Sequence, residues 1–150
     1  MKSFFIFVVF MSTVIAVQSQ ASIDSVKAAV NQLFTAMKNA DGVMLKNSFT
    51  DSALLQTIVT NKEGKIIVMT ESIAGFVDFI NKEAPGNADE RIVFESIKID
   101  GPLAMAWTPY EFYYKAGFSH CGVNSFQLVK QAGVWKIQYI IDTRRKKPCQ

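Results

Sequence analysis

The residues that could do acid-base chemistry in this chain lie close together in its second half. Glu111, Tyr113 and His120 flank a turn at Ala116-Gly117, and an even loop there places Tyr113 opposite His120 and Glu111 opposite Gly122. A carboxylate beside an imidazole favours the charged ring, and such a pair can move a proton near neutral pH. Glu111 and His120 are therefore the candidate catalytic pair. The alternative is a hydrogen-bonded pair at a solvated pocket mouth that only orients Tyr113.

Three side chains are candidate ligand contacts on the same face. The register places Trp107 opposite Phe126, and Tyr113 and Asn124 share that face. An indole stacks on a flat ligand with little loss of conformational entropy, and an amide can read a polar ligand edge. Either side chain could instead be packed or hydrogen-bonded within the core. We expect Trp107, Tyr113 and Asn124 to contact a small organic ligand.

The chain holds two cysteines, Cys121 and Cys149, and one histidine, His120. Two cysteines in an exported protein tend to be bridged, and the bond would close a loop of ~28 residues. The alternative is one buried and one exposed thiol. A metal site on the cysteines lacks further ligands, so we expect neither a metal nor a cofactor.

The N-terminus has the pattern of a secretory leader. Lys2 precedes an apolar run over residues 4–17, and small residues follow it at Ser19 and Ala21. We expect a signal peptide over residues 1–21, cut after Ser19 or Ala21, and a secreted or periplasmic protein. The alternative, an uncleaved membrane anchor, is disfavoured because the run is shorter than the ~20 residues that span a bilayer. No stable membrane anchor is expected.

Length and charge set the domain organisation. The 150 residues, 49% of them hydrophobic, suffice for one core, which we place at residues 22–143. The net charge of +3 is modest, and the dense basic run lies in a tail over residues 144–150. Nucleic acid is therefore not an expected partner. The basic run is expected to be solvated, although Arg144 and Arg145 could also bind an anion or a lipid surface.

Hydrophobic periodicity predicts three helices followed mainly by strands. Apolar spacing indicates a helix over residues 23–37 with Ser22 as its cap, a short helix after Gly42, and a helix over residues 73–80. A hairpin is expected at residues 53–60 and 65–69. Four further strands are expected at residues 91–99, 103–115, 118–130 and 134–143. The predicted class is α+β, with N-terminal helices packed on a curved antiparallel sheet.

The second turn gives a consistent division of the sheet into two faces. An even loop at Ala132-Gly133 places Leu128 opposite Ile137 and Phe126 opposite Tyr139. The opposite face is then too apolar to be left exposed to solvent, and its large apolar residues include Tyr110, Phe112, Tyr114, Val123 and Val129. We therefore expect a homodimer formed through this outer sheet face.

The order of elements resembles that of the nuclear transport factor 2-like superfamily, which includes SnoaL-like proteins and has a cystatin-like α+β roll with a cone-shaped pocket. Four segments look most like an exported bacterial family named for lumazine binding: residues 108–113, 119–123, 125–129 and 135–145. This resemblance implies the fold. It also favours a homodimer, because sheet-mediated dimers are frequent in the superfamily that the chain resembles. It does not imply lumazine binding or a reaction.

Two enzyme types of this fold do not transfer to the chain. The ketosteroid isomerase type has a carboxylate base on its first strand, whereas residues 53–60 contain no acid. Scytalone dehydratase-like chemistry uses more than one cavity histidine, and only His120 is present. Three function classes follow, in this order: a non-catalytic pocket for a small organic molecule, an acid-base isomerase, dehydratase or cyclase using Glu111 and His120, and a dimeric interaction module with a vestigial cavity.

Overall fold

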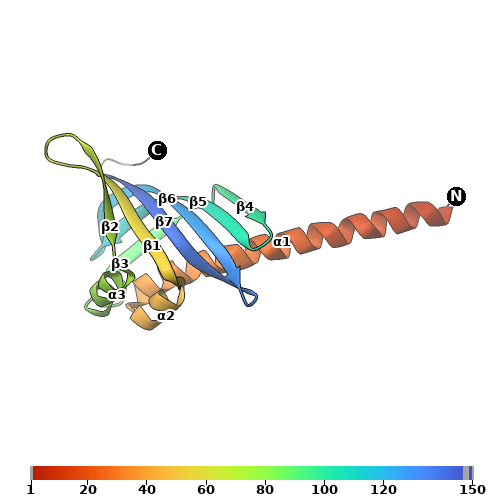
Figure 1. Cartoon of the computed structure of the whole chain (residues 1–150), viewed down its shortest axis with the longest axis horizontal. Coiled ribbons are helices and arrows are strands. Elements are labelled where there is room, and N and C mark those ends of the chain that lie inside the picture. Colours follow the sequence, from red (N-terminus) through yellow and green to blue (C-terminus); the bar gives the residue numbers. More distant parts are fainter. Residues whose placement is uncertain (1, 147–148, 150) are drawn as a thin grey trace.

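Three helices pack against one seven-stranded sheet (Figure 1). The structure is a computed structural model that describes residues 2–146 and 149, with side chains from residue 20 onward. The helices are α1 Lys2–Asn39, α2 Gly42–Asn47 and α3 Ile73–Asn81. The strands are β1 Phe49–Thr60, β2 Ile66–Glu71, β3 Ala88–Ile92, β4 Ser96–Asp100, β5 Leu103–Tyr114, β6 Gly117–Gln131 and β7 Val134–Arg145.

The predicted α+β class is confirmed, but the sheet is mixed and not purely antiparallel. Its strand order is β2-β1-β7-β6-β5-β3, with β4 also paired to β5. Strands β1 and β7 are parallel, while every other pair is antiparallel. The parallel pair could not be inferred from turns, because the whole second half of the chain separates its strands. The strand expected at residues 91–99 is two strands, β3 and β4.

Local sequence signals set the two short helices. Asp41 caps α2, because its side chain accepts a 2.9 Å hydrogen bond from the backbone N–H of Met44. Ser72 caps α3 in the same way, accepting from the N–H of Gly75 at 3.0 Å. Each cap satisfies one of the otherwise unpaired N–H groups of a first helical turn. Helix α1 has no cap at Ser22, where we expected it to begin, since it continues from Lys2 through Asn39.

The core forms where α1 crosses the sheet. Buried α1 side chains at Val26, Val30 and Leu33 pack with Phe126 and Leu128 of β6 in one cluster. Each such side chain contributes about 1.5–3 kcal/mol when it is fully withdrawn from water. This packing holds α1 against the sheet and fixes the face of the sheet that looks toward the helices, which we call the inner face.

Two bulges decide which side chains reach the inner face. The pairing of β5 with β6 shifts between Phe112 and Tyr113, which leaves Ser119 as the extra residue of β6. The pairing of β6 with β7 shifts between Gln127 and Leu128, which leaves Gln138 as the extra residue of β7. A bulge displaces the alternation of a strand by one residue, so side chains beyond it exchange faces.

The predicted register is therefore wrong on β5 and on part of β7. His120 lies opposite Phe112 instead of Tyr113, and Phe126 lies opposite Ala106 instead of Trp107. On β7, Leu128 faces Ile137 as predicted, but Phe126 faces Ile140 instead of Tyr139. The even-numbered residues of β5 therefore point toward the inner face. The same holds for the even-numbered residues of β7 that follow Gln138.

The termini bear on the predictions of export. No helix among the residues that the structure describes is long and apolar enough to cross a membrane. The predicted signal peptide and its cut after Ser19 fall on residues whose side chains lie outside the description. The cut after Ala21 falls within the continuous helix α1.

Strand β7 extends through Arg145, past the predicted domain boundary at residue 143. Residues 147, 148 and 150 of the predicted basic tail also lie outside the described residues.

Candidate functional site

A cavity of about 290 Å³ lies between the inner face of the sheet and helices α1 and α3. Its walls are mostly apolar: Leu33, Phe34 and Met37 from α1, Phe76 and Phe79 from α3, and Leu55, Phe112, Phe126 and Ile140 from the sheet. Its polar lining comprises Glu71, Glu90, Tyr110, His120, Asn124, Asp142 and Arg144. Helices α1 and α3 supply no titratable group. All charge in the cavity therefore comes from the strands.

Glu90 is a carboxyl group of the cavity lining that comes from strand β3. It lies opposite Phe112 in the register of β3 with β5, on the inner face, and is partly buried. Asn124 of β6 donates a 2.8 Å hydrogen bond from Nδ2 to Glu90 Oε1. Oε2 has no hydrogen-bond partner among the described residues. One carboxyl oxygen is thus fixed in place, and the other is free to meet a ligand.

The surroundings of Glu90 favour its neutral form. Burial raises the pKa of this carboxyl from 4.5 to about 7, and the negative charge of Asp142 adds to the rise. The hydrogen bond from Asn124 and the positive charge of Arg144 act in the opposite direction and are weaker than the effect of burial. Near neutral pH, Glu90 therefore populates both protonation states, as a group that gives and takes protons requires.

Asp142 has the opposite environment, because hydrogen-bond donors surround its buried carboxylate. Thr57 Oγ1 donates to Oδ1 at 2.5 Å, while Tyr110 OH and Arg144 Nε each donate to Oδ2 at 3.0 Å. The side chain of Asp142 is 7% exposed. A buried carboxylate with three donors has its charge compensated and its orientation fixed. Asp142 therefore acts as the structural anchor of the polar part of the cavity.

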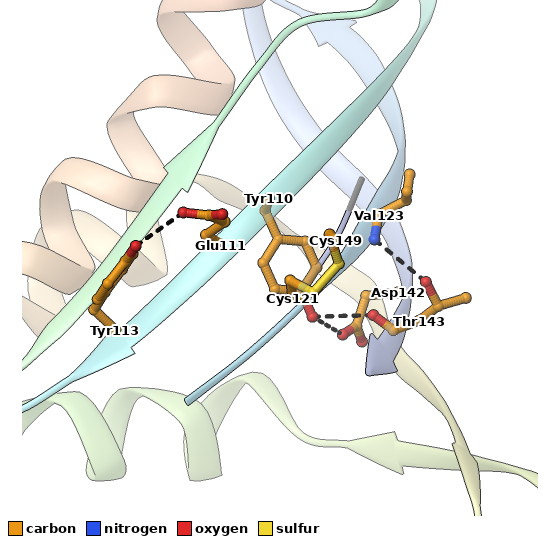
Figure 2. The surroundings of a disulfide bond; sticks show 8 residues. All are labelled: Tyr110, Glu111, Tyr113, Cys121, Val123, Asp142, Thr143 and Cys149. Carbon is orange, nitrogen blue, oxygen red and sulfur yellow. Dashed lines mark hydrogen bonds between the residues drawn. A yellow bond between two sulfur atoms is a disulfide. The ribbon is translucent and has the colours of Figure 1, made fainter. Parts of the chain in front are cut away.

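The Tyr110 hydroxyl connects this anchor to the backbone of β7. It lies 3.0 Å from both Asp142 Oδ2 and the carbonyl oxygen of Thr143 (Figure 2). Burial, together with the negative charges of Asp142 and Glu90, raises the pKa of Tyr110 well above 10. The phenol is therefore a neutral donor. It positions Asp142 and forms part of the cavity wall.

A glycine on β6 makes room for this tyrosine. Gly122 lies opposite Tyr110, and an added Cβ atom would stand 1.7 Å from the Thr143 carbonyl oxygen and 3.0 Å from Tyr110 Cε1. Any side chain at Gly122 would therefore collide with the backbone of β7 and with the tyrosine ring. The chain requires glycine here for close approach.

Arg144 brings a positive charge to the cavity. It donates from Nε to Asp142 and from Nη2 to Thr57 Oγ1, the latter at 3.0 Å. Its side chain is 46% exposed, and Glu71 and Phe79, which also line the cavity, are exposed. These residues mark the place where the cavity opens to solvent. An anionic group of a ligand would meet Arg144 there.

His120 lies on the inner face beside two aromatic rings. Its ring is 5.7 Å from the Tyr110 ring and 5.1 Å from the Phe112 ring, centroid to centroid. Nδ1 is 3.0 Å from Ser119 Oγ. Burial, and then the positive charge of Arg144, lower the pKa of His120 below 6.5. The ring is consequently neutral at pH 7, and it is not the imidazolium that a neighbouring Glu111 would have favoured.

Comparison with solved structures places this architecture among known ones. A protein of unknown function from Shewanella baltica matches 85% of this chain and 96% of its own, with a TM-score of 0.66 at 17% identity. A protein from Methylobacillus flagellatus matches 83% of this chain and 93% of its own, with a TM-score of 0.64 at 22% identity. Both are described as nuclear transport factor 2-like. This chain has the nuclear transport factor 2-like fold.

A third structure agrees with this assignment. A domain with a cystatin-like fold from Nostoc punctiforme matches 85% of this chain and 79% of its own, with a TM-score of 0.63 at 14% identity. No protein-family model and no curated protein matches the sequence. At these identities the likeness shows the nuclear transport factor 2-like fold, and a function has to be argued from this chain's own residues.

Within this fold, the predicted site residues divide between the two faces. His120 and Asn124 line the cavity. Glu111, Tyr113 and Trp107 do not, because the bulge at Ser119 turns the odd-numbered residues of β5 outward. Glu111 lies opposite Cys121 and accepts a 2.9 Å hydrogen bond from the Tyr113 hydroxyl, while Trp107 is 41% exposed. The expected pairing of Glu111 with His120 is therefore wrong.

The expected outer face changes for the same reason. Tyr110 and Phe112 line the cavity, and the Tyr114 hydroxyl donates to Glu83 at 2.8 Å while its ring stacks near Phe79. These three aromatic residues point toward the helices. Val123 and Val129 remain partly buried on the other side.

The predicted disulfide is confirmed, since Cys121 and Cys149 are bonded with their Cα atoms 6.0 Å apart. Figure 2 shows the bridge beside Tyr110 and Asp142, so the tail is attached close to the polar part of the cavity. Among the described residues, no group of three or more His, Cys, Asp or Glu is placed to hold a metal ion.

Four residues that line the cavity are not among the predicted catalytic or ligand-binding side chains of the sheet: Glu90, Tyr110, Asp142 and Arg144. Glu90 precedes the strand expected from residue 91, so the pattern predicts no orientation for it, whereas β3 begins at Ala88. The predicted register places Tyr110 on the outer face and gives no orientation for Asp142, while Arg144 is expected in a solvated tail or bound to an anion or lipid surface. One signal was available for Asp142, because an acid amid the apolar residues of strand 134–143 requires a buried partner.

Proposed function

We propose that this protein is exported and binds a small, mostly apolar organic molecule in the cavity of its nuclear transport factor 2-like fold. The observation that supports this function is the cavity itself, which combines nine apolar lining residues with a cluster of polar groups on the strands. Apolar walls with a few directed polar groups are typical of small-molecule sites. A cavity filled by its own phenylalanines, as in a vestigial site, would have left no such volume.

The size and polarity of the cavity define the ligand class. A volume of about 290 Å³ is at the lower end of the range for ligand pockets, so the ligand has one or two rings and not more. The polar groups of Glu90, Asn124 and His120 are near one another on the inner face, and Arg144 is at the opening. The ligand is thus an apolar ring system with a hydrogen-bonding group at its inner end.

Ligand capture tests this function. The protein is isolated from the compartment to which it is exported, and mass spectrometry identifies the molecule that co-purifies. Binding of that molecule, and of flat bicyclic probes including lumazine, is measured by the rise in melting temperature. We expect one of these ring compounds to stabilise the protein.

Two matched variants decide whether binding uses the cavity. Leu55 lines it, whereas its neighbour Leu54 is 40% exposed and does not. Leu55→Trp fills the cavity and should abolish the ligand-induced rise, while Leu54→Trp should leave it unchanged. Equal binding by both variants would mean that the ligand sits elsewhere on the protein.

Export is supported by the leader pattern at residues 1–21 and by the disulfide, which forms in oxidising compartments. N-terminal sequencing of the mature protein tests it. A chain that begins at Gln20 or Ser22 is the expected result, and an intact Met1 or Lys2 in the membrane fraction would contradict it.

A further inference from the structure

The cavity has a second feature beyond simple binding, namely a carboxyl group in its lining that accepts a hydrogen bond at one oxygen only. Glu90 Oε1 is held by Asn124, whereas Oε2 has no partner among the described residues. We propose that Glu90 is a general acid-base group that takes a proton from the molecule in the cavity and returns it. This inference rests on the proposed function, because it requires that a ligand occupies the cavity.

The other carboxyl groups of the site are unsuited to this role. Asp142 accepts three hydrogen bonds, and taking up a proton would disrupt the bonds from Thr57, Tyr110 and Arg144. Glu71 is exposed at the opening, so water solvates its charge. Withdrawing a carboxylate from water destabilises its charged form, so the group binds a proton more tightly. A desolvated carboxylate is therefore a stronger base. Glu90 alone among these three carboxyl groups combines desolvation with an oxygen that accepts no hydrogen bond from the described residues.

The proton transfer needs no cofactor to balance. Glu90 Oε2 forms a bond to the hydrogen of a ligand C–H group, the C–H bond breaks, and its electron pair remains on the ligand. The ligand then carries a negative charge, which Arg144 at the cavity opening attracts. Return of the same proton to a different atom of the ligand completes an isomerisation. The substrate class is therefore a small apolar ring compound with an acidic C–H bond next to an electron-withdrawing group.

The protonation state of Glu90 is set by its burial and by groups on strands β6 and β7. Burial raises the pKa of Glu90 to about 7, and the Asp142 charge supports this rise against the effects of Asn124 and Arg144. The other titratable groups that line the cavity are Glu71, Tyr110 and His120, and the residues of α1 and α3 that line it are apolar. A base of this kind is ionised in about half of the molecules at neutral pH, where it is most effective.

The test uses 5-nitrobenzisoxazole, a flat bicyclic probe that reports on desolvated bases. A base removes its ring C–H proton, the ring N–O bond breaks, and the coloured product is a cyanonitrophenolate. No other reactant is consumed. The rate is measured across pH for the wild type, for Glu90→Gln, and for Glu111→Gln, whose carboxyl group lies exposed on the other face of the sheet. Binding of unreactive nitroindazole is measured in parallel by melting temperature.

We expect the wild-type rate to rise with pH and to reach half of its maximum near pH 7. Glu90→Gln should lose about 100-fold in rate while still binding nitroindazole, and Glu111→Gln should match the wild type. If nitroindazole binds but the rate is unchanged in Glu90→Gln, or if the wild-type half-maximum lies near pH 4.5, the role of Glu90 is refuted and the binding function stands. If neither probe binds the wild type, the binding function fails, and the role of Glu90 fails with it.

Discussion

Asn124 donates a 2.8 Å hydrogen bond to Glu90 across strand β5, which separates their strands β6 and β3 in the sheet. Side chains on strands that are not neighbours meet only where the sheet curves toward them or where the chains are long. The bond thus joins two parts of the inner face over the aromatic side chains of β5. It also leaves the second oxygen of Glu90, a residue that lines the cavity, without a hydrogen bond from the described residues.

The raised pKa of Glu90 predicts a pH-dependent stability. The pKa of Glu90 is about 7 in the folded protein, whereas the ordinary value for a glutamate is 4.5. Folding therefore favours the protonated form. This contribution is fully present below pH 4.5 and is lost as the pH rises through about 7. At about 1.4 kcal/mol per pH unit, the loss amounts to about 3 kcal/mol. Urea unfolding of the wild type and Glu90→Gln between pH 4 and pH 8.5 measures it.

The difference between the two unfolding curves isolates Glu90, because every other titrating group is common to both proteins. Glu90→Gln should gain stability relative to the wild type as the pH rises, and Glu111→Gln should run parallel to the wild type. A constant difference for Glu90→Gln over the whole range would show that the carboxyl group is not desolvated.

The tyrosines of β5 predict a contrast between its two faces. Tyr110→Phe removes a donor from the buried Asp142 carboxylate and from the Thr143 carbonyl group, so the free energy of unfolding should fall by about 1–3 kcal/mol. Tyr113→Phe removes a hydroxyl that bonds the exposed Glu111, and the stability should hardly change. Denaturant unfolding at pH 7 compares them. Equal losses would mean that the two faces of β5 are assigned incorrectly.

The sequence predicted the order and type of the elements because those follow from apolar periodicity and turn residues. The disulfide followed from the presence of two cysteines in a chain expected to be exported, while the signal peptide stays a prediction. The site required the parity of β5 and β7, and parity reverses at each bulge. Ser119 and Gln138, the two extra residues, are ordinary strand residues with no sequence mark of a bulge. The prediction that His120 and Asn124 lie on the inner face was correct, because both follow the bulge at Ser119 on strand β6, where the predicted alternation still holds.

The disulfide predicts a measurable loss when it is removed. Cys121 is fully buried, and the bond to Cys149 closes a separation of 28 residues. Cys149→Ala should lower the free energy of unfolding by about 3–4 kcal/mol through the greater entropy of the open unfolded chain. The double variant Cys121→Ala with Cys149→Ala should lose a similar amount, because both proteins lack the same bond. A double variant as stable as the wild type would show that the bridge constrains nothing.

A homodimer through the outer sheet face stays a prediction, and the structure changes how it is tested. Phe112 lines the cavity, so Phe112→Lys would probe the pocket and not an interface. Trp107 is a large aromatic residue that β5 turns outward, with 41% of its surface exposed. Trp107→Lys should therefore give monomers in light scattering, whereas Val43→Lys on α2, which is 74% exposed, should not. A monomeric wild type at tens of micromolar would contradict the dimer.

The close approach at Gly122 predicts the largest effect of a single methyl group. Gly122→Ala places a Cβ atom 1.7 Å from the Thr143 carbonyl oxygen and 3.0 Å from Tyr110 Cε1, so β6 and β7 must separate or the tyrosine must leave Asp142. The cost should be on the order of 3 kcal/mol. Gly117→Ala is the matched control on the same strand, because its Cβ atom would meet only the Tyr114 carbonyl oxygen at 3.6 Å, an ordinary contact.

Thermal unfolding of both glycine variants, followed by nitroindazole binding, tests this geometry. Gly122→Ala should melt well below the wild type and bind the probe weakly, because displacement of Tyr110 removes part of the cavity wall and a donor from Asp142. Gly117→Ala should match the wild type in both measurements. If Gly122→Ala folds with wild-type stability, β6 and β7 do not approach as closely as the pairing of Gly122 with Arg144 requires, and the inward placement of Asp142 on β7 would be wrong.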